Sequence, residues 1–215
     1  MRKLRTIEMN RLSVEEFKQA EKLPLIVVLD DVRSLYNVGS VFRTCDAFRV
    51  EAIYLCGITA TPPSNEIHKT ALGAEDSVDW KYFQTAEEAV AELHRNGYFV
   101  YSVEQAEGST KLNEVGWWME KLRSCATQGK GEKEKCTSSI NPSSSPIGET
   151  LPPSTLIHPP SKYAVVFGNE VKGVHQSVID LSDGCLEIPQ FGTKHSMNVA
   201  VTAGIVIWEF AKHSI

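Results

Sequence analysis

The sequence lacks any long apolar run, and its five cysteines form no closely spaced pair. No run approaches the roughly 18 apolar residues of a membrane-spanning helix, and the basic N-terminus has no apolar stretch of the signal-peptide kind. The cysteines are odd in number, widely spread and without a C-x-x-C pair, which argues against a disulfide framework and against a zinc site. We therefore expect unpaired reduced thiols, no metal, no membrane association and a cytoplasmic location.

The sequence also lacks a strong excess of charge of either sign. Its formal net charge of −5 does not by itself indicate nucleic-acid binding, although a local basic patch is compatible with that total. The hydrophobic fraction of 42% and the charged fraction of 23% are ordinary for a globular protein. With 215 residues the chain is long enough for one α/β domain with a full core, or for two small domains.

Short apolar segments alternate with helical patterns along the chain. This alternation is typical of the α/β fold class, in which a mostly parallel sheet is flanked by helices. The expected strands cover residues 24–31, 51–57, 77–83, 98–104, 162–168 and 185–190. The expected helices cover residues 13–22, 37–48, 85–97 and 196–213. Capping boxes at Ser13/Glu16 and Thr85/Glu88 indicate where two of these helices begin.

Residues 124–161 interrupt the alternation. They contain eight serines and six of the ten prolines, a composition that cannot bury enough apolar surface to offset the entropy of ordering. We interpret this stretch as a flexible insertion within one domain, residues 24–215, preceded by a short helical extension, residues 1–23. The alternative is a linker between two domains, but about two strands and two helices follow it, too little for an independent core.

Polar residues follow the first expected strand in the segment "LDDVRSLYNVGSVFRT", residues 29–44. In open α/β sheets, ligands bind beyond the carboxyl ends of the strands. Here Asn37 is expected to cap the helix, Gly39 permits close backbone approach, and Arg43 and Asn37 can point to the same pocket mouth. A simple helix cap beside a solvated arginine is the alternative interpretation.

A second polar loop occurs in "VVFGNEVKGV", residues 165–174. Gly168 ends a strand, and Glu170 is expected near the start of the next helix, where the helix dipole favours a carboxylate. The glycine spacing does not match the G-x-G-x-x-G fingerprint of dinucleotide-binding proteins, and Glu170 would repel a pyrophosphate. This disfavours a nucleotide-dependent oxidoreductase.

A third polar loop lies in "LEIPQFGTKHSMNVAVTAGIVIWEF", residues 186–210. Pro189 ends the strand, Ser196 is expected to cap the long final helix, and Asn198 is expected in the first turn. An asparagine in an otherwise apolar first turn either satisfies a buried partner or faces a site. Three such loops at one edge of a sheet would form one pocket.

Taken in order, the three segments resemble the motifs of the SpoU (TrmH-like) family of RNA 2′-O-ribose methyltransferases, within the SPOUT superfamily. The likeness covers roughly residues 24–123 and 162–212. The three motifs together are strongly specific, whereas any one alone would be weak. The matching residues are Asn37-x-Gly39-x-x-x-Arg43, then Phe167-Gly168-Asn169-Glu170-x-x-Gly173, then Ile188-Pro189-Gln190-x-Gly192-x-x-x-Ser196-Met197-Asn198-Val199-Ala200.

The resemblance implies a SPOUT α/β knot, that is, a mostly parallel sheet flanked by helices with a deep C-terminal trefoil knot, an exception to the rule that folds are unknotted. It implies S-adenosyl-L-methionine as cofactor, structured RNA (tRNA or rRNA) as substrate, and a homodimer with the pocket near the subunit interface. The implied cofactor-binding residues are Val103, Gly168, Ile188 and Met197. Many members have leucine where Met197 stands, a mild change because both side chains are apolar and similar in volume.

The resemblance also implies the catalytic residues Arg43, Asn37, Glu170, Ser196 and Asn198. A guanidinium does not readily release its proton. Our hypothesis is therefore that Arg43 binds the adjacent phosphate and stabilises developing alkoxide charge, while Asn37 orients Arg43 or the ribose and the others complete a polar wall. The alternative is a non-catalytic RNA-binding relative that retains the knot fold; the presence of all five polar residues argues against it.

Overall fold

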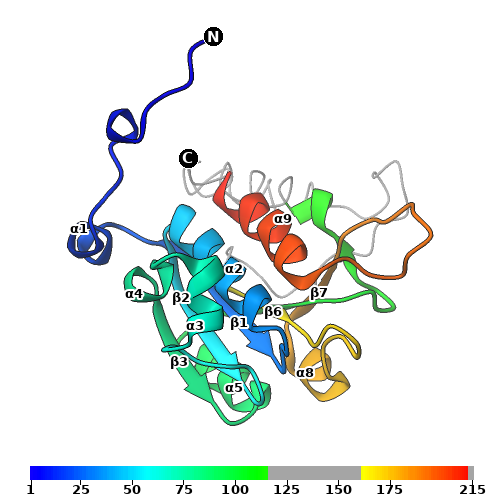
Figure 1. The fold of residues 1–215 in the computed structure, drawn as a ribbon. Helices are drawn as coiled ribbons and strands as arrows, with labels where there is room; N and C mark the ends of the chain where they lie inside the picture. Colours follow the sequence, from blue (N-terminus) through cyan, green and yellow to red (C-terminus); the bar gives the residue numbers. More distant parts are fainter. Residues whose placement is uncertain (116–160, 213–215) are drawn as a thin grey trace, which may run out of the picture.

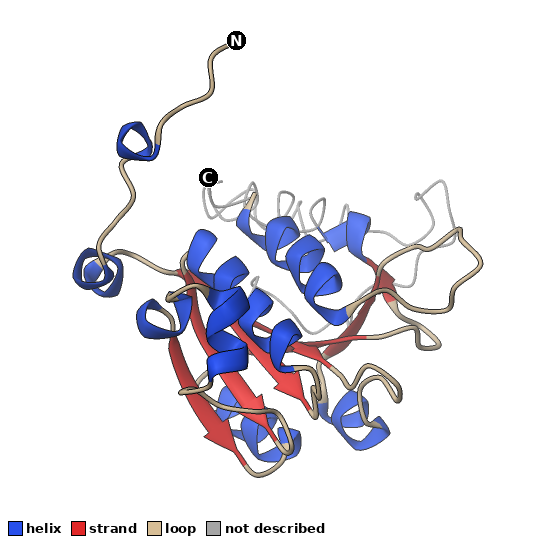
Figure 2. Ribbon diagram, in the orientation of Figure 1, coloured by secondary structure: helices blue, strands red, loops and turns tan. Residues whose placement is uncertain are grey.

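The computed structural model describes residues 1–115 and 161–212, which contain a seven-stranded sheet (Figures 1 and 2). The strand order is β3-β2-β1-β6-β4-β7-β5, and every neighbouring pair is parallel. The predicted mostly parallel α/β sheet is thus confirmed. The strands are β1 (Leu23–Asp30), β2 (Val50–Cys56), β3 (Asp79–Phe83), β4 (Phe99–Val103), β5 (Thr110–Lys111), β6 (Tyr163–Phe167) and β7 (Gly184–Glu187).

Helices cover both faces of the sheet. One face carries α2 (Leu35–Ala47), α3 (Asn65–Ala71), α4 (Ala74–Ser77) and α9 (Val199–Ala211); the other carries α5 (Ala86–Arg95) and α8 (Gln176–Leu181) (Figure 1). A 3-10 helix, η1 (Thr6–Met9), and α1 (Val14–Gln19) precede the sheet. None of the described helices is long and apolar enough to cross a membrane.

Strand β1, which lies in the interior of the sheet beside the central strand β6, is buried on both faces. Leu25, Val27 and Leu29 join the core beneath α2 and α9, whereas Ile26 and Val28 join the core on the side of α5. A parallel strand covered on both faces needs apolar side chains at every position rather than at alternate ones. This requirement explains the continuous apolar run from which the strand was predicted.

Two predicted helix caps are wrong by two or three residues. Ser34, not Asn37, caps α2, because its hydroxyl accepts a hydrogen bond from the backbone N–H of Asn37 at 3.3 Å. Asn198, not Ser196, caps α9, and its Oδ1 accepts from the N–H groups of Ala200 and Val201. Serine and asparagine are equally good caps, so residue preference alone could not choose between neighbouring candidates.

Several short elements were not predicted, namely η1, α3, α4 and β5. Each has two to seven residues, too few to show a clear hydrophobic period. The cysteines in the described part of the chain, Cys45, Cys56 and Cys185, are free thiols, as expected. Apart from Ser161, the proposed insertion at 124–161 lies outside the described residues, and the trefoil knot stays a prediction.

Candidate functional site

The three polar loops meet at one edge of the sheet. Strand β6 lies between β1 and β4, and Phe167 at its end pairs in register with Leu29 of β1. Strand β7 is the other neighbour of β4. Since all these strands are parallel, the loops that follow them leave from the same edge, where open α/β sheets bind ligands (Figure 1).

The Glu170 carboxylate binds the start of α2. Its two oxygens accept hydrogen bonds from the backbone N–H groups of Arg33 and Ser34, both at 3.0 Å. The predicted position near the start of the next helix is wrong, because α8 begins at Gln176 with His175 as its cap. Burial raises the pKa of Glu170, but the hydrogen bonds outweigh this and the net pKa is below its ordinary value, so the group is ionised at neutral pH.

Asn37 joins the second and third polar loops. Its side-chain Nδ2 donates to Glu170 at 3.1 Å, and its Oδ1 accepts from Nδ2 of Asn198 at 3.1 Å. The Asn198 Oδ1 is meanwhile held by the start of α9. Three of the predicted site residues, one from each motif, are therefore connected by consecutive side-chain hydrogen bonds.

The loop that carries Glu170 folds back on itself at two glycines. Asn169 and Gly173 exchange two backbone hydrogen bonds, at 3.0 and 2.9 Å. A Cβ atom at Gly168 would lie 2.1 Å from the carbonyl carbon of Gly173, so no other residue fits there without moving the backbone. The Asn169 side chain also donates to the carbonyl of Asp31 at 2.7 Å, which fastens this loop to the end of β1.

A pocket of about 300 Å³ lies beside this loop. It is lined by all four predicted cofactor-binding residues, Val103, Gly168, Ile188 and Met197, and by two predicted catalytic residues, Glu170 and Ser196. The remaining lining includes apolar residues and several polar ones, among them Glu104, Gln105, Lys172, Glu187, Gln190, His195 and Thr202.

Glu104 is a pocket residue that the sequence interpretation missed. Its Oε2 accepts from the backbone N–H of Val174 at 3.1 Å, and it packs so closely that a Cβ at Gly173 would be 2.1 Å away. With Glu187 it makes part of the pocket lining acidic. The sequence did contain a signal for Glu104, because this acidic residue comes directly after the buried strand β4. A polar residue directly after a strand is the pattern by which the other three loops were identified.

Residues 24–208 match the sequence profile of the SpoU rRNA Methylase family. The chain belongs to this family. Among its relatives, a tRNA (guanosine(18)-2′-O)-methyltransferase of Thermus thermophilus is 25% identical over 202 residues, which cover 94% of this chain and 81% of that protein. The 23S rRNA (guanosine-2′-O-)-methyltransferase RlmB of Nitrosomonas europaea is 30% identical over 191 residues, which cover 88% of this chain and 57% of that protein.

Solved SpoU structures share the fold. The A. aeolicus TrmH/SpoU tRNA modifying enzyme superposes with a TM-score of 0.64 at 21% identity, covering 93% of this chain and 79% of that one. The AdoMet-bound rRNA methyltransferase from Sinorhizobium meliloti superposes with a TM-score of 0.63 at 21% identity, covering 91% and 61%. The chain thus spans less than two thirds of the length of some of its relatives.

Arg43 of the first SpoU motif does not line this pocket. It is exposed on α2 and borders a separate hollow with Ser40, Thr44, Ala47, Phe48, Lys69 and Thr70. The expectation that Arg43 and Asn37 point to one mouth is therefore wrong within a single chain. Asn37 does not line the pocket either, since its amide is engaged by Glu170 and Asn198.

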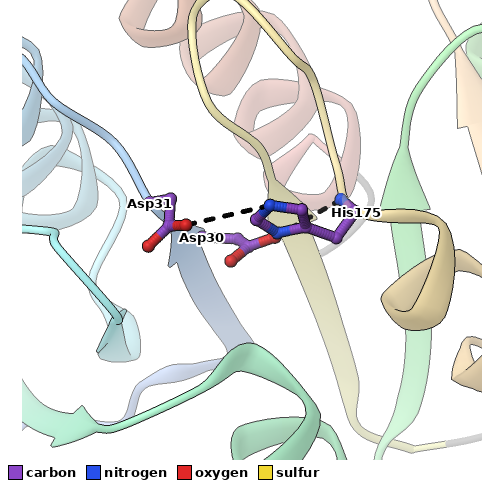
Figure 3. A group of neighbouring side chains, drawn as sticks. All are labelled: Asp30, Asp31 and His175. Carbon is purple, nitrogen blue, oxygen red and sulfur yellow. Dashed lines mark hydrogen bonds and ion pairs between the residues drawn. The ribbon is translucent and has the colours of Figure 1, made fainter.

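Asp30 and Asp31, at the end of β1, form a cluster with His175, the residue that precedes α8 (Figure 3). The His175 Nδ1 lies 2.9 Å from Oδ2 of Asp30, and its Nε2 lies 3.8 Å from Oδ2 of Asp31. One side-chain oxygen or nitrogen atom of each residue lies within 4.8 Å of those of the other two, a spacing that could hold a metal ion. Burial raises the pKa of Asp30 more than His175 lowers it. In this SpoU protein the contact between His175 and Asp30 joins the end of the Glu170 loop to β1.

Proposed function

We propose that the protein transfers a methyl group from S-adenosyl-L-methionine to a ribose 2′-hydroxyl of structured RNA, tRNA or rRNA. The observation that carries the proposal is the bridge Glu170–Asn37–Asn198, which ties the first SpoU motif to the second and third motifs, and residues of those two motifs line one pocket. Membership of the SpoU family and the names of the relatives support it.

The pocket suits this cofactor. Its volume of about 300 Å³ lies at the lower end of the usual range for small-molecule sites. Val103, Ile188 and Met197 offer apolar contacts, while Glu104 and Glu187 place carboxylates in the lining. The three carboxylate residues of the lining, Glu104, Glu170 and Glu187, outnumber its one lysine, Lys172. The lining therefore favours a ligand with positive charge over a pyrophosphate, which again disfavours a nucleotide-dependent oxidoreductase. When bound, S-adenosyl-L-methionine supplies an electrophilic methyl group.

Arg43 and Ser196 act on the RNA, whereas Asn37 and Asn198 hold the loops of the site in place. A ribose hydroxyl is a poor nucleophile until its proton leaves, and Arg43 stabilises the developing negative charge while holding the adjacent phosphate. Ser196 lines the pocket and is exposed, so its hydroxyl can reach the ribose. Asn37 and Asn198 position the three loops, because their side chains already bond to each other and, through Asn37, to Glu170.

We further infer a homodimer. Val201, Ile205 and Trp208 form an exposed apolar stripe on α9, with 55%, 39% and 48% exposure. This stripe lies beside α2, since the ring of Trp208 is 5.7 Å from that of Phe48, the residue that follows α2. Arg43 is on α2, so a second copy that covers the stripe would bring Arg43 of one chain toward the pocket of the other.

We also infer a single domain from residue 24 to 215, with 1–23 as an extension and 124–161 as an insertion. Strand β6 follows the insertion yet lies between β1 and β4, which precede it. Neither part of the chain therefore completes the sheet alone. Proteolysis within 124–161 should give two fragments that remain associated on a sizing column, and separation of the fragments would contradict the inference.

Two measurements test the proposed activity. Calorimetry should show binding of S-adenosyl-L-methionine and none of NAD. Methyl transfer from the radiolabelled cofactor to bulk tRNA or rRNA should then be detected. Binding of the cofactor without transfer to any RNA would favour a non-catalytic RNA-binding relative, and binding of NAD would favour an oxidoreductase.

A further inference from the structure

Phe191 is an exposed aromatic residue next to a pocket residue in the chain. Phe191 is 98% exposed and lies in the loop between β7 and α9, which extends away from the sheet in Figure 1, where it is orange. Its neighbour Gln190 lines the pocket, and the same loop returns to the pocket at His195. Single exposed apolar residues are common, but this one directly follows Gln190, a residue that lines the candidate active site.

Two exposed lysines lie on the loops that border the pocket. Two carboxylate residues of the lining, Glu104 and Glu187, are half-buried, and the third, Glu170, is exposed and bound to the start of α2. The lysines nearby, Lys172 on the Glu170 loop and Lys194 on the Phe191 loop, are exposed, and neither makes an ion pair with another described residue. In a chain of net charge −5, this places two positive charges without an ion-pair partner at the pocket, Lys172 in its lining and Lys194 next to the lining residue His195 in the chain.

We propose that Phe191 stacks against a base of the RNA substrate and that Lys172 and Lys194 bind the phosphates on either side. The proposal rests on the proposed methyltransferase function. Single-stranded regions of RNA present unstacked bases, and proteins bind them with aromatic rings flanked by cations. A ribose that reaches into the pocket brings its base close to the pocket lining, and Phe191 is one residue away from the lining residue Gln190. The ring does not line the pocket, so it is not a wall of the cofactor site.

Substitution of Phe191 separates stacking from other roles. In Phe191→Ala, the KM for bulk tRNA or rRNA should rise about five- to 150-fold, the range for loss of one stacked base. The kcat and the Kd for S-adenosyl-L-methionine should stay within about twofold. Phe191→Tyr retains the ring and should behave as the wild type. Leu181→Ala is the matched control, because Leu181 is a 47% exposed apolar residue at the end of α8.

Four results would overturn the proposal. They are an unchanged KM for RNA in Phe191→Ala, a parallel rise in the Kd for the cofactor, failure of Phe191→Tyr to restore the wild-type KM, and a change of oligomeric mass in Phe191→Ala. The last would mean that the ring belongs to a subunit interface.

Binding of a fluorescent oligoribonucleotide tests stacking without catalysis. The probe is a single strand of about 12 nucleotides, within the usual footprint of such sites, containing 2-aminopurine. The wild type and Phe191→Tyr should quench its fluorescence, and equal quenching by Phe191→Ala would contradict the proposal. If the wild type methylates no RNA, the methyltransferase function fails, whereas the quenching result still decides the role of Phe191.

The two lysines are tested by salt dependence. Lys172→Ala and Lys194→Ala should each weaken oligoribonucleotide binding and reduce the slope of log Kd against log salt by about 0.7 to 1, the effect of one phosphate contact. Lys18→Ala, at an exposed lysine on α1, is the control and should leave the slope unchanged. An unchanged slope in both pocket variants would remove the lysines from the proposal.

Discussion

The side-chain amide of Asn37 donates a hydrogen bond to Glu170, 133 residues further along the chain. The carbonyl of the same amide accepts from Asn198. An amide is suited to this junction because it offers a donor and an acceptor on one planar group, whereas a carboxylate offers only acceptors. We regard this contact as the connection that aligns the three SpoU motifs.

Asn37→Asp should break the junction. The new carboxylate would face the ionised Glu170 and lose the donated hydrogen bond, so the free energy of unfolding should fall by about 1–3 kcal/mol. Urea denaturation measures this change. Asn113→Asp, at an exposed asparagine, is the control. Equal stability of both variants would show that the junction contributes nothing.

The pH dependence of stability should carry the signature of Glu170. Its pKa is lowered in the folded state, so the ionised group stabilises the fold above its ordinary pKa of 4.5. This contribution is lost as the pH falls below 4.5 and through the folded pKa. The Tm of the wild type should therefore exceed that of Glu170→Gln at pH 7, and the difference should shrink in acid. A Tm difference that is constant with pH would contradict the assignment.

Gly168→Ala should damage the pocket. The added methyl would meet the backbone of Gly173 and Val174 at 2.1–2.2 Å, and backbone atoms cannot turn aside as a flexible side chain can. We expect a loss of stability of about 1–3 kcal/mol and weaker cofactor binding. Gly192→Ala is the control, because nothing lies within 4 Å of the added atom. Thermal unfolding measures the stability of both variants, and calorimetry measures their binding of S-adenosyl-L-methionine.

Arg43→Ala should separate catalysis from cofactor binding. Because Arg43 lies outside the pocket of its own chain and is assigned to the RNA phosphate rather than to the cofactor, the Kd for S-adenosyl-L-methionine should not change. Methyl transfer should fall about 100-fold or more, as when a group that stabilises transition-state charge is removed. Arg95→Ala, at an exposed arginine on α5, should keep its rate. Methylation by Arg43→Ala at the wild-type rate would contradict the assignment of Arg43 as a catalytic residue.

A charge on the α9 stripe should separate the subunits. Trp208→Glu would bury a carboxylate at the proposed interface, so light scattering should report a monomer instead of a dimer. Ile58→Glu is the control, since Ile58 is 65% exposed in the loop after β2. A monomeric wild type, or a dimeric Trp208→Glu protein, would contradict the proposed interface.

The sequence allowed prediction of features that depend on neighbouring residues. The apolar run of β1 and the Thr85/Glu88 pattern at the start of α5 are local patterns, and both elements are present. The expected capping box is complete at Ser13/Glu16, whereas at α5 the structure shows only its first half, the hydrogen bond from the N–H of Glu88 to the Thr85 hydroxyl. The pocket membership of Val103, Gly168, Ile188 and Met197 came from the family resemblance, and all four line one pocket.

Contacts between distant segments were beyond such patterns. Glu170 was expected to serve the helix that follows it, but it binds backbone groups 136 and 137 residues earlier. Local sequence patterns identify only the helix that is nearest in the chain. The order of strands in the sheet decides which helix begins beside the Glu170 loop, and here it is α2. The separation of Arg43 from the pocket has the same origin, because the direction of a side chain on α2 depends on which face of the helix packs against the sheet.

The most direct test of the methyltransferase proposal is mass spectrometry of nucleosides. RNA from cells that lack the gene is incubated with the protein and with S-adenosyl-L-methionine that carries a deuterated methyl group, and is then digested to nucleosides. The account predicts that the label appears in a nucleoside whose ribose fragment, and not its base, carries the deuterated methyl. Label on the base, or no label in tRNA or rRNA, would contradict it.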